Sequence, residues 1–189
     1  MGAQVIALLL ASLISSTDCN EYLSSNVEVQ DGIKYVYYTK KFDGECVLDG
    51  LWTEYFIDTG NIRSRGEYKR NVKQGHWFWN RRSGARQMQG GFKNDKEDGY
   101  WIFFHANGVR FMEGPYRDGF QVGQWMMFYE DGTMYAKTMW AAGHIEGELV
   151  YYHSNGKKSM VGTITQGKRS GHWTWWDEQG NIKEEKTYD

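Results

Sequence analysis

The chain has 189 residues, and its 24 acidic and 22 basic residues leave a net charge of −2. Hydrophobic residues make up 40% of it and aromatic residues 16%, which excludes an intrinsically disordered protein and a strongly charged nucleic-acid binder. With 23 glycines, one proline, 9 tryptophans, 13 tyrosines and 9 phenylalanines, the composition favours short aromatic strands joined by glycine turns over helices.

An apolar run occupies residues 5–14. It is too short to span a bilayer of about 30 Å, but it has the length of a signal-peptide core. Ser15 and Thr17 supply small residues at the two positions that a signal peptidase reads. We therefore predict a signal peptide over residues 1–17, cleavage before Asp18, and an exported protein that is secreted, periplasmic or displayed at the cell surface. The alternative is an N-terminal strand or helix of a cytosolic protein.

Two cysteines follow, Cys19 and Cys46, both upstream of the clear repeats. In an oxidising compartment they could form one disulfide that clamps the N-terminal cap, which would stabilise it by about 3 kcal/mol. A second interpretation makes Cys19 a lipidated cysteine, although Asp18 precedes it where lipoprotein processing favours a small residue. A third interpretation leaves both thiols free.

Residues 18–49 form a degenerate copy of the unit that follows. Asp31-Gly32 and Asp43-Gly44 are expected to be turns, and residues 35–38, Tyr-Val-Tyr-Tyr, are expected to be a strand. We predict that this segment caps the N-terminal end of a repeat array, because an open sheet end invites pairing with other chains.

From residue 50 to residue 189 the sequence repeats with a period of 24 residues, which predicts one small unit stacked on copies of itself. The six copies begin at Gly50, Gly75, Gly99, Gly123, Gly147 and Gly171, and the first carries one extra residue. Two residues later come Trp52, Trp77, Trp101, Trp125, Leu149 and Trp173. A second glycine follows in each copy, mostly behind Asn, Asp or Gln, and predicts a tight hairpin turn between two strands.

The second strand of most copies contains a glycine. These strand glycines are Gly66, Gly90, Gly114 and Gly162, with Thr138 and Lys186 at the same position in the other two copies. Glycine weakens a strand unless a large ring packs over it, so we expect each repeat tryptophan to cover the glycine of a neighbouring strand. A largely buried ring removes about 150–250 Å² from water, which contributes on the order of 4–6 kcal/mol before entropy.

The predicted fold is therefore all-β: an elongated antiparallel hairpin meander that forms an open single-layer sheet, with about 12 strands over the six copies. Each hairpin would add about 9.6 Å to the array. Glu184, Glu185 and Lys186 place charges in the last strand, which is typical of a C-terminal cap.

This unit, Gly-x-Trp, an aromatic residue, Asn/Asp-Gly, and then a strand ending in Gly-x-Tyr, resembles the MORN repeat, and more closely the MORN-variant repeats of bacterial proteins of the YwqK type. The resemblance covers residues 50–189. It implies a β-hairpin array that binds proteins or associates with membranes, and some proteins of the YwqK type are antitoxin or immunity components. It carries over no catalytic residue.

The five histidines occupy recurring positions of the repeat rather than a cluster. His76 and His172 share a variable slot that we expect to be exposed, and His105 and His153 lie two copies apart, about 19 Å, too far to bind one metal ion. His144 is expected in an inter-strand turn. No nucleophile elbow or phosphate-binding loop occurs, so we predict no enzyme activity, no cofactor and no metal site.

Basic residues concentrate in the first two copies. They suggest a patch for an acidic protein or an anionic membrane, and the alternative is a solvated sheet face. The residues are Arg63, Arg65, Lys69, Arg70, Arg81, Arg82 and Arg86.

Three functions follow from these patterns. The first is an exported, non-enzymatic scaffold that binds a protein, of which an immunity protein bound to a toxin is a special case. The second is membrane association through the basic copies. The third is a choline- or glycan-binding module, with residues 77–79 and 173–176 as aromatic walls.

Overall fold

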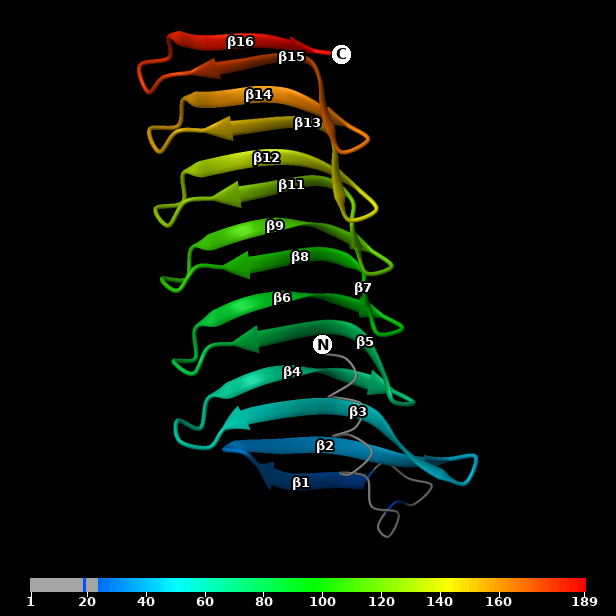
Figure 1. Cartoon of the computed structure of the whole chain (residues 1–189). Helices are drawn as coiled ribbons and strands as arrows, with labels where there is room; N and C mark the ends of the chain where they lie inside the picture. The colour runs from blue at the N-terminus through cyan, green and yellow to red at the C-terminus, as the bar shows by residue number, and fades with distance from the viewer. Residues whose placement is uncertain (1–18, 20–23) are drawn as a thin grey trace. The chain divides into compact units, whose positions relative to one another are not determined.

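The computed structural model describes Cys19 and residues 24–189, so the predicted signal peptide lies outside the described residues. The described part contains sixteen strands and no helix, which confirms the all-β prediction (Figure 1). Accordingly, nothing in residues 24–189 forms a helix long and apolar enough to cross a membrane.

The chain divides into two compact units, and β6 contributes residues to both. The first unit runs to Ala85 and includes Phe92–Asp95, and the second comprises Arg86–Gly91 and Lys96–Asp189. The strands up to Ala85 are β1 (Ser24–Gln30), β2 (Ile33–Phe42), β3 (Glu45–Phe56), β4 (Ile62–Lys69) and β5 (Val72–Asn80). The later strands are β6 (Arg86–Lys93), β7 (Lys96–Glu97), β8 (Gly99–Phe104), β9 (Arg110–Arg117), β10 (Phe120–Gln121), β11 (Gly123–Phe128), β12 (Met134–Ala141), β13 (His144–Tyr152), β14 (Lys158–Thr165), β15 (Lys168–Trp176) and β16 (Ile182–Tyr188).

Within each unit the long strands pair antiparallel with their neighbours in sequence. In the first unit the pairs run from β1–β2 to β4–β5. In the second they run from β6–β8 through β9–β11 to β15–β16, with the two-residue β10 paired to β9. The predicted hairpin meander is therefore the architecture of each unit.

The repeat tryptophans form the core of this thin sheet, since Trp77, Trp125 and Trp173 are at most 1% exposed. Each ring lies so close to the strand glycine of the preceding copy that a Cβ added there would fall inside the indole. The pairs are Trp77 on Gly66, Trp101 on Gly90, Trp125 on Gly114 and Trp173 on Gly162. A side chain at these glycines would displace the ring that covers the sheet.

Further contacts hold each buried indole in place. The Trp77 Nε1 donates to the Gln74 carbonyl at 3.1 Å, and the Trp173 Nε1 makes the equivalent bond to the Ser170 carbonyl at 3.1 Å. The ring of Tyr68 meets Trp77 edge-on, with 5.2 Å between the ring centroids. Each indole N–H is thereby buried together with its carbonyl acceptor. This avoids the free-energy cost of about 1–3 kcal/mol that a buried donor without an acceptor would carry.

Copies four and five depart from this Trp-on-Gly arrangement, because both the glycine and the tryptophan are replaced. Thr138 replaces the glycine of copy four, and Leu149 replaces the tryptophan of copy five that would lie over it. The two residues are direct cross-strand partners and both are buried. The Thr138 hydroxyl accepts a hydrogen bond from the Trp140 Nε1 at 2.8 Å. The larger residue at one position thus compensates for the smaller one at the other.

Asp31-Gly32 and Asp43-Gly44 are tight two-residue turns, as predicted. Within the six copies, the turns differ from the sequence prediction in their placement. Tight two-residue turns with both residues at positive φ join one copy to the next, as at Arg70-Asn71. At the predicted tight turns the strands are instead joined by longer loops, such as residues 129–133. There the Asp131 carboxylate accepts from the Thr133 N–H at 2.7 Å, and only Gly132 adopts a positive φ. Asn or Asp at this position of the loop forms a side-chain hydrogen bond to a backbone N–H two residues later, which is the other role of these residues in turns.

The N-terminal segment is tied to the first unit by a disulfide between Cys19 and Cys46, whose Cα atoms lie 5.7 Å apart. Cys46 lies at the start of β3. Both cysteines take part in this bond. The structure therefore has the disulfide, rather than the lipidated Cys19 or the two free thiols that were the alternatives.

Candidate functional site

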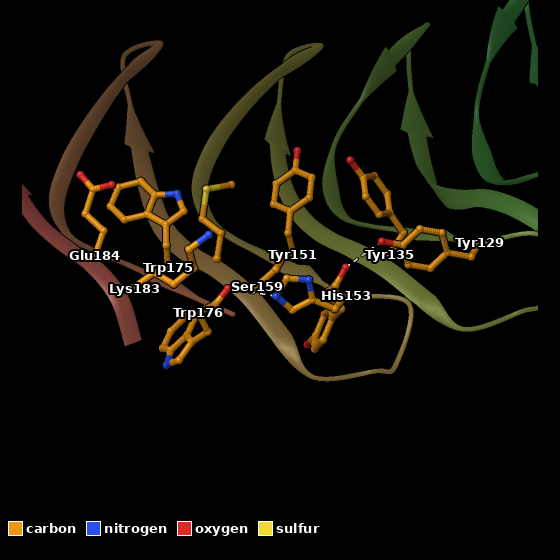
Figure 2. A pocket seen from close by; sticks show the side chains of 11 residues that line it. Tyr129, Tyr135, Tyr151, His153, Ser159, Trp175, Trp176, Lys183 and Glu184 are labelled. Atoms are coloured by element: carbon orange, nitrogen blue, oxygen red, sulfur yellow. Dashed lines mark hydrogen bonds between the residues drawn. The ribbon is translucent and has the colours of Figure 1, made fainter. Parts of the chain in front are cut away.

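An open groove of about 590 Å³ crosses the sheet in copies four to six, within the second unit (Figure 2). Aromatic side chains dominate its lining, with a few polar groups among them. The lining residues are Tyr129, Tyr135, Tyr151, Tyr152, His153, Ser159, Met160, Trp175, Trp176, Lys183 and Glu184.

One wall of the groove is a row of side chains that runs across four strands. Tyr151 of β13 is the cross-strand partner of Met160 of β14, Met160 is the partner of Trp175 of β15, and Trp175 is the partner of Glu184 of β16. Figure 2 shows Tyr151, Trp175 and Glu184 projecting from neighbouring strands toward the same side. Because strands lie about 4.8 Å apart, this row spans about 14 Å.

Three tyrosines continue the aromatic surface toward copy four. The ring of Tyr135 meets Tyr129 and Tyr151 edge-on, at centroid distances of 5.1 and 5.3 Å. The Tyr129 hydroxyl donates to the Tyr152 carbonyl at 2.9 Å. Burial raises the pKa values of Tyr129 and Tyr151 above the usual range of a tyrosine phenol. The surface is therefore preorganised and carries hydroxyl donors.

His153 is held by the same kind of contact between copies. Its Nε2 lies 3.0 Å from the Trp176 carbonyl oxygen, and because a carbonyl only accepts, this nitrogen carries the proton. His105 makes the equivalent bond to the Phe128 carbonyl at 2.8 Å. At this position of the repeat, the histidine side chain therefore links its copy to the next one by a hydrogen bond. In the part of the chain that the structure describes, no three His, Cys, Asp or Glu residues are placed to hold a metal ion.

The remaining histidines are spread over the repeats. His76 and His172 are exposed, and His172 lies 3.2 Å from the Glu185 carboxylate. His144 is the first residue of β13 rather than part of the turn where the sequence analysis placed it. Two-residue turns are short enough that the strand begins directly after Gly143.

The tryptophan walls proposed for a ligand cage already face cations of the chain itself. Trp77 stacks on Trp79 with 5.8 Å between centroids, and the Lys73 Nζ lies 4.8 Å from the centre of Trp77. Arg169 covers the corresponding pair in the last copy, 4.7 Å from Trp173. These rings contribute to packing, whereas Trp175 and Trp176 also reach the groove.

The basic residues of the first two copies do not gather on one surface. Lys69 and Arg70 lie at one end of β4, and Arg63, Arg81 and Arg82 lie near the other end, about 20 Å away along the strand. Arg65 is exposed on β4 between these ends. Arg86 belongs to the second unit, where burial lowers the pKa of its guanidinium.

Several of these cations also have partners within the chain. Arg63 pairs with Glu54 at 3.2 Å, and Arg82 pairs with Asp58 at 2.6 Å. The Arg70 guanidinium lies 3.9 Å from the centre of the Phe42 ring. The two ion pairs reduce the positive charge that the first unit offers to a ligand.

The groove could not be predicted from the sequence because its lining residues occupy several different positions of the repeat. Differences between neighbouring copies nevertheless mark part of it. Tyr135 and Tyr151 replace Phe111 and Met127 of the preceding copy, so copies four and five each gain a hydroxyl on this surface. The sequence shows which residues differ between copies, but it does not show which of these residues lie on the same face of the sheet.

Comparison with known proteins supports the repeat assignment. The family described as the MORN repeat variant matches residues 169–189, which form the last copy. No curated protein matches the chain. A solved structure titled crystal structure of TarM aligns with 88% of this chain and 23% of that chain, at 10% identity and a TM-score of 0.28. This chain thus spans about a quarter of that protein, and a likeness so weak carries no functional argument.

Proposed function

We propose that this chain, whose last copy matches the MORN repeat variant, is a non-enzymatic scaffold whose ligand is another protein. The proposed binding surface is the aromatic groove of copies four to six. Tyrosine and tryptophan dominate the binding energy of many protein interfaces, and this groove concentrates six of them.

The state of the groove before binding supports this role. Tyr129 and His153 are fixed by hydrogen bonds to backbone carbonyls of the next copy. Tyr135 remains 38% exposed although it packs against two other rings. Rings held in place before binding lose little conformational entropy when a partner covers them, which favours affinity.

We further propose that the protein acts outside the cytoplasm. Disulfides persist in oxidising compartments, and the bond between Cys19 and Cys46 fits such a location together with the apolar run of residues 5–14. A secreted toxin would be one suitable partner, in which case the scaffold would be an immunity protein.

Membrane association through the basic residues receives less support. The cations lie at separate ends of the first unit, and Arg63 and Arg82 are paired with carboxylates. A membrane surface attracts clustered cations, each worth about 1 kcal/mol, and this arrangement offers few of them together.

Site-specific photo-crosslinking tests the proposal. A benzophenone amino acid would replace Tyr135, and in a matched control it would replace Phe111, which is 44% exposed and packs on His105 as Tyr135 packs on Tyr129. Phe111 occupies the same repeat position one copy earlier and does not line the groove. We expect one protein to be captured at position 135 and not at position 111. Capture of lipid, or equal capture of the same proteins at both positions, would contradict the proposal.

A further inference from the structure

We infer that the groove binds a polyproline II segment of its partner, rich in proline and carrying a basic residue. This inference rests on the proposed function and specifies the partner's chemistry. Four features support it: the spacing of the copies, the chemistry of the rings, the supply of hydrogen-bond donors and the charge around the groove.

The spacing of equivalent side chains matches the pitch of a polyproline II helix. Tyr151 and Trp175 occupy the same position in successive copies, which are two strands or about 9.6 Å apart. A polyproline II helix advances about 9.3 Å in each turn of three residues. A segment that crosses the strands would therefore present every third residue to successive copies.

Other backbone conformations match this spacing less well. Same-face residues of a β-strand recur every 6.4–6.8 Å or so, and two turns of an α-helix advance about 10.8 Å. These values differ from the copy spacing by about 3 Å and 1 Å, whereas the polyproline II pitch differs by about 0.3 Å. The mismatch accumulates with each copy, so a groove that covers three copies favours the best match.

The lining suits prolines and their exposed carbonyls. Tyr135, Tyr151 and Trp175 present flat apolar rings, against which a pyrrolidine packs without leaving an N–H unsatisfied. A polyproline II helix makes no internal hydrogen bonds, so its carbonyls need donors from the protein. The hydroxyls of Tyr135, Tyr151 and Ser159 and the Lys183 ammonium lie around the groove and can supply them.

Charge around the groove favours a basic residue beside the prolines. The loops of copies four to six at this end of the sheet carry four carboxylates, those of Glu130, Asp131, Asp177 and Glu178. They carry one lysine, Lys157, whose ammonium donates to the Gln179 carbonyl at 2.8 Å. Glu184 adds a carboxylate next to Trp175 inside the groove, opposed there by Lys183.

Fluorescence anisotropy with synthetic peptides tests the inference on the full chain. The probe is a labelled nonapeptide of three Arg-Pro-Pro units, and its control has alanine in place of each proline. We expect the proline peptide to bind at least tenfold more tightly. Tyr135→Ala should weaken its binding at least fivefold, and Phe111→Ala should leave it within twofold.

Three further measurements keep the outcomes distinct: a Tyr135→Phe variant, competition by small ligands and competition with the captured partner. Tyr135→Phe retains the ring, and we expect it to fold as the parent does by thermal melting and to lose two- to fivefold in affinity through its hydroxyl. Equal binding of the proline and alanine peptides, or displacement of the probe by choline or a neutral oligosaccharide, would overturn the inference. Capture of a partner at position 135 that the proline peptide fails to displace would overturn it too, while leaving the protein-binding function intact.

Discussion

Trp77 lies directly on the backbone of Gly66, and a methyl group at that glycine would occupy the space of the indole ring. The same relationship recurs in copies three, four and six, where it joins the hairpin to the one before it. A single-layer sheet can bury little else, so these contacts supply much of its core.

Substituting Gly66 tests this contact. Gly66→Ala should lower the free energy of unfolding by about 2–3 kcal/mol, because the added methyl forces Trp77 out of its position. Denaturant unfolding followed by tryptophan fluorescence measures the loss. Glu67→Ala, at an exposed position beside it, should change stability by less than about 0.5 kcal/mol. If both variants unfold at the parental midpoint, the Trp-on-Gly contact does not limit stability.

The Thr138 and Leu149 pair predicts a rescue. Leu149→Trp should destabilise the protein by about 1–3 kcal/mol, because the indole would collide with the Thr138 side chain. Adding Thr138→Gly should recover most of that loss by recreating the arrangement of the other copies. A double-mutant cycle isolates this coupling. Additive effects of the two substitutions would contradict the compensation that we describe.

Removal of the disulfide should destabilise the first unit. The bond closes a loop between residues 27 positions apart, so the double variant Cys19→Ser, Cys46→Ser should lose about 3.5 kcal/mol on the loop-entropy account. Thermal melting with and without reductant provides the control. Reductant should lower the melting temperature of the parent and leave that of the variant unchanged.

The loop carboxylate of Asp131 should make stability depend on acid pH. Backbone N–H donation by Thr133 lowers the pKa of Asp131 in the folded state. A lowered folded pKa gives stability that is present above the ordinary aspartate pKa of about 3.9 and is lost as the pH falls through the folded value. Asn107 and Asn155 accept the same bond without titrating.

Asp131→Asn therefore serves as the test. The variant should match the parent at pH 7 and lose less stability than the parent between pH 5 and pH 2, as measured by urea unfolding. An identical pH profile for the two proteins would show that this hydrogen bond has no part in acid unfolding.

Much of this fold could be predicted from the sequence, since the period determines which residues recur on neighbouring strands. The Trp-on-Gly stacking followed from the pairing of a large ring with a missing side chain, which recur at two fixed positions of the repeat. The loops were less predictable. Asn-Gly suits a tight turn by its φ values and a longer loop by its side-chain hydrogen bond, and the sequence does not distinguish these uses.

The aromatic groove could not be predicted from the sequence, because it depends on side-chain exposure and on contacts across strands. Tyr135 and Tyr151 belong to different columns of the repeat, and their contact arises only once the hairpins pair in register. For the basic residues, closeness in the sequence does not mean closeness in the structure. Lys69 and Arg82 lie close in sequence, yet the antiparallel strands β4 and β5 place them at opposite ends.

The affinity of the captured partner for two alanine variants tests the central claim most directly. Isothermal titration should show at least a tenfold loss of affinity for Tyr135→Ala and a change of less than twofold for Phe111→Ala, since the two residues match in repeat position and exposure and only Tyr135 lines the groove. Equal affinities for both variants and the parent would place the binding surface elsewhere on the molecule.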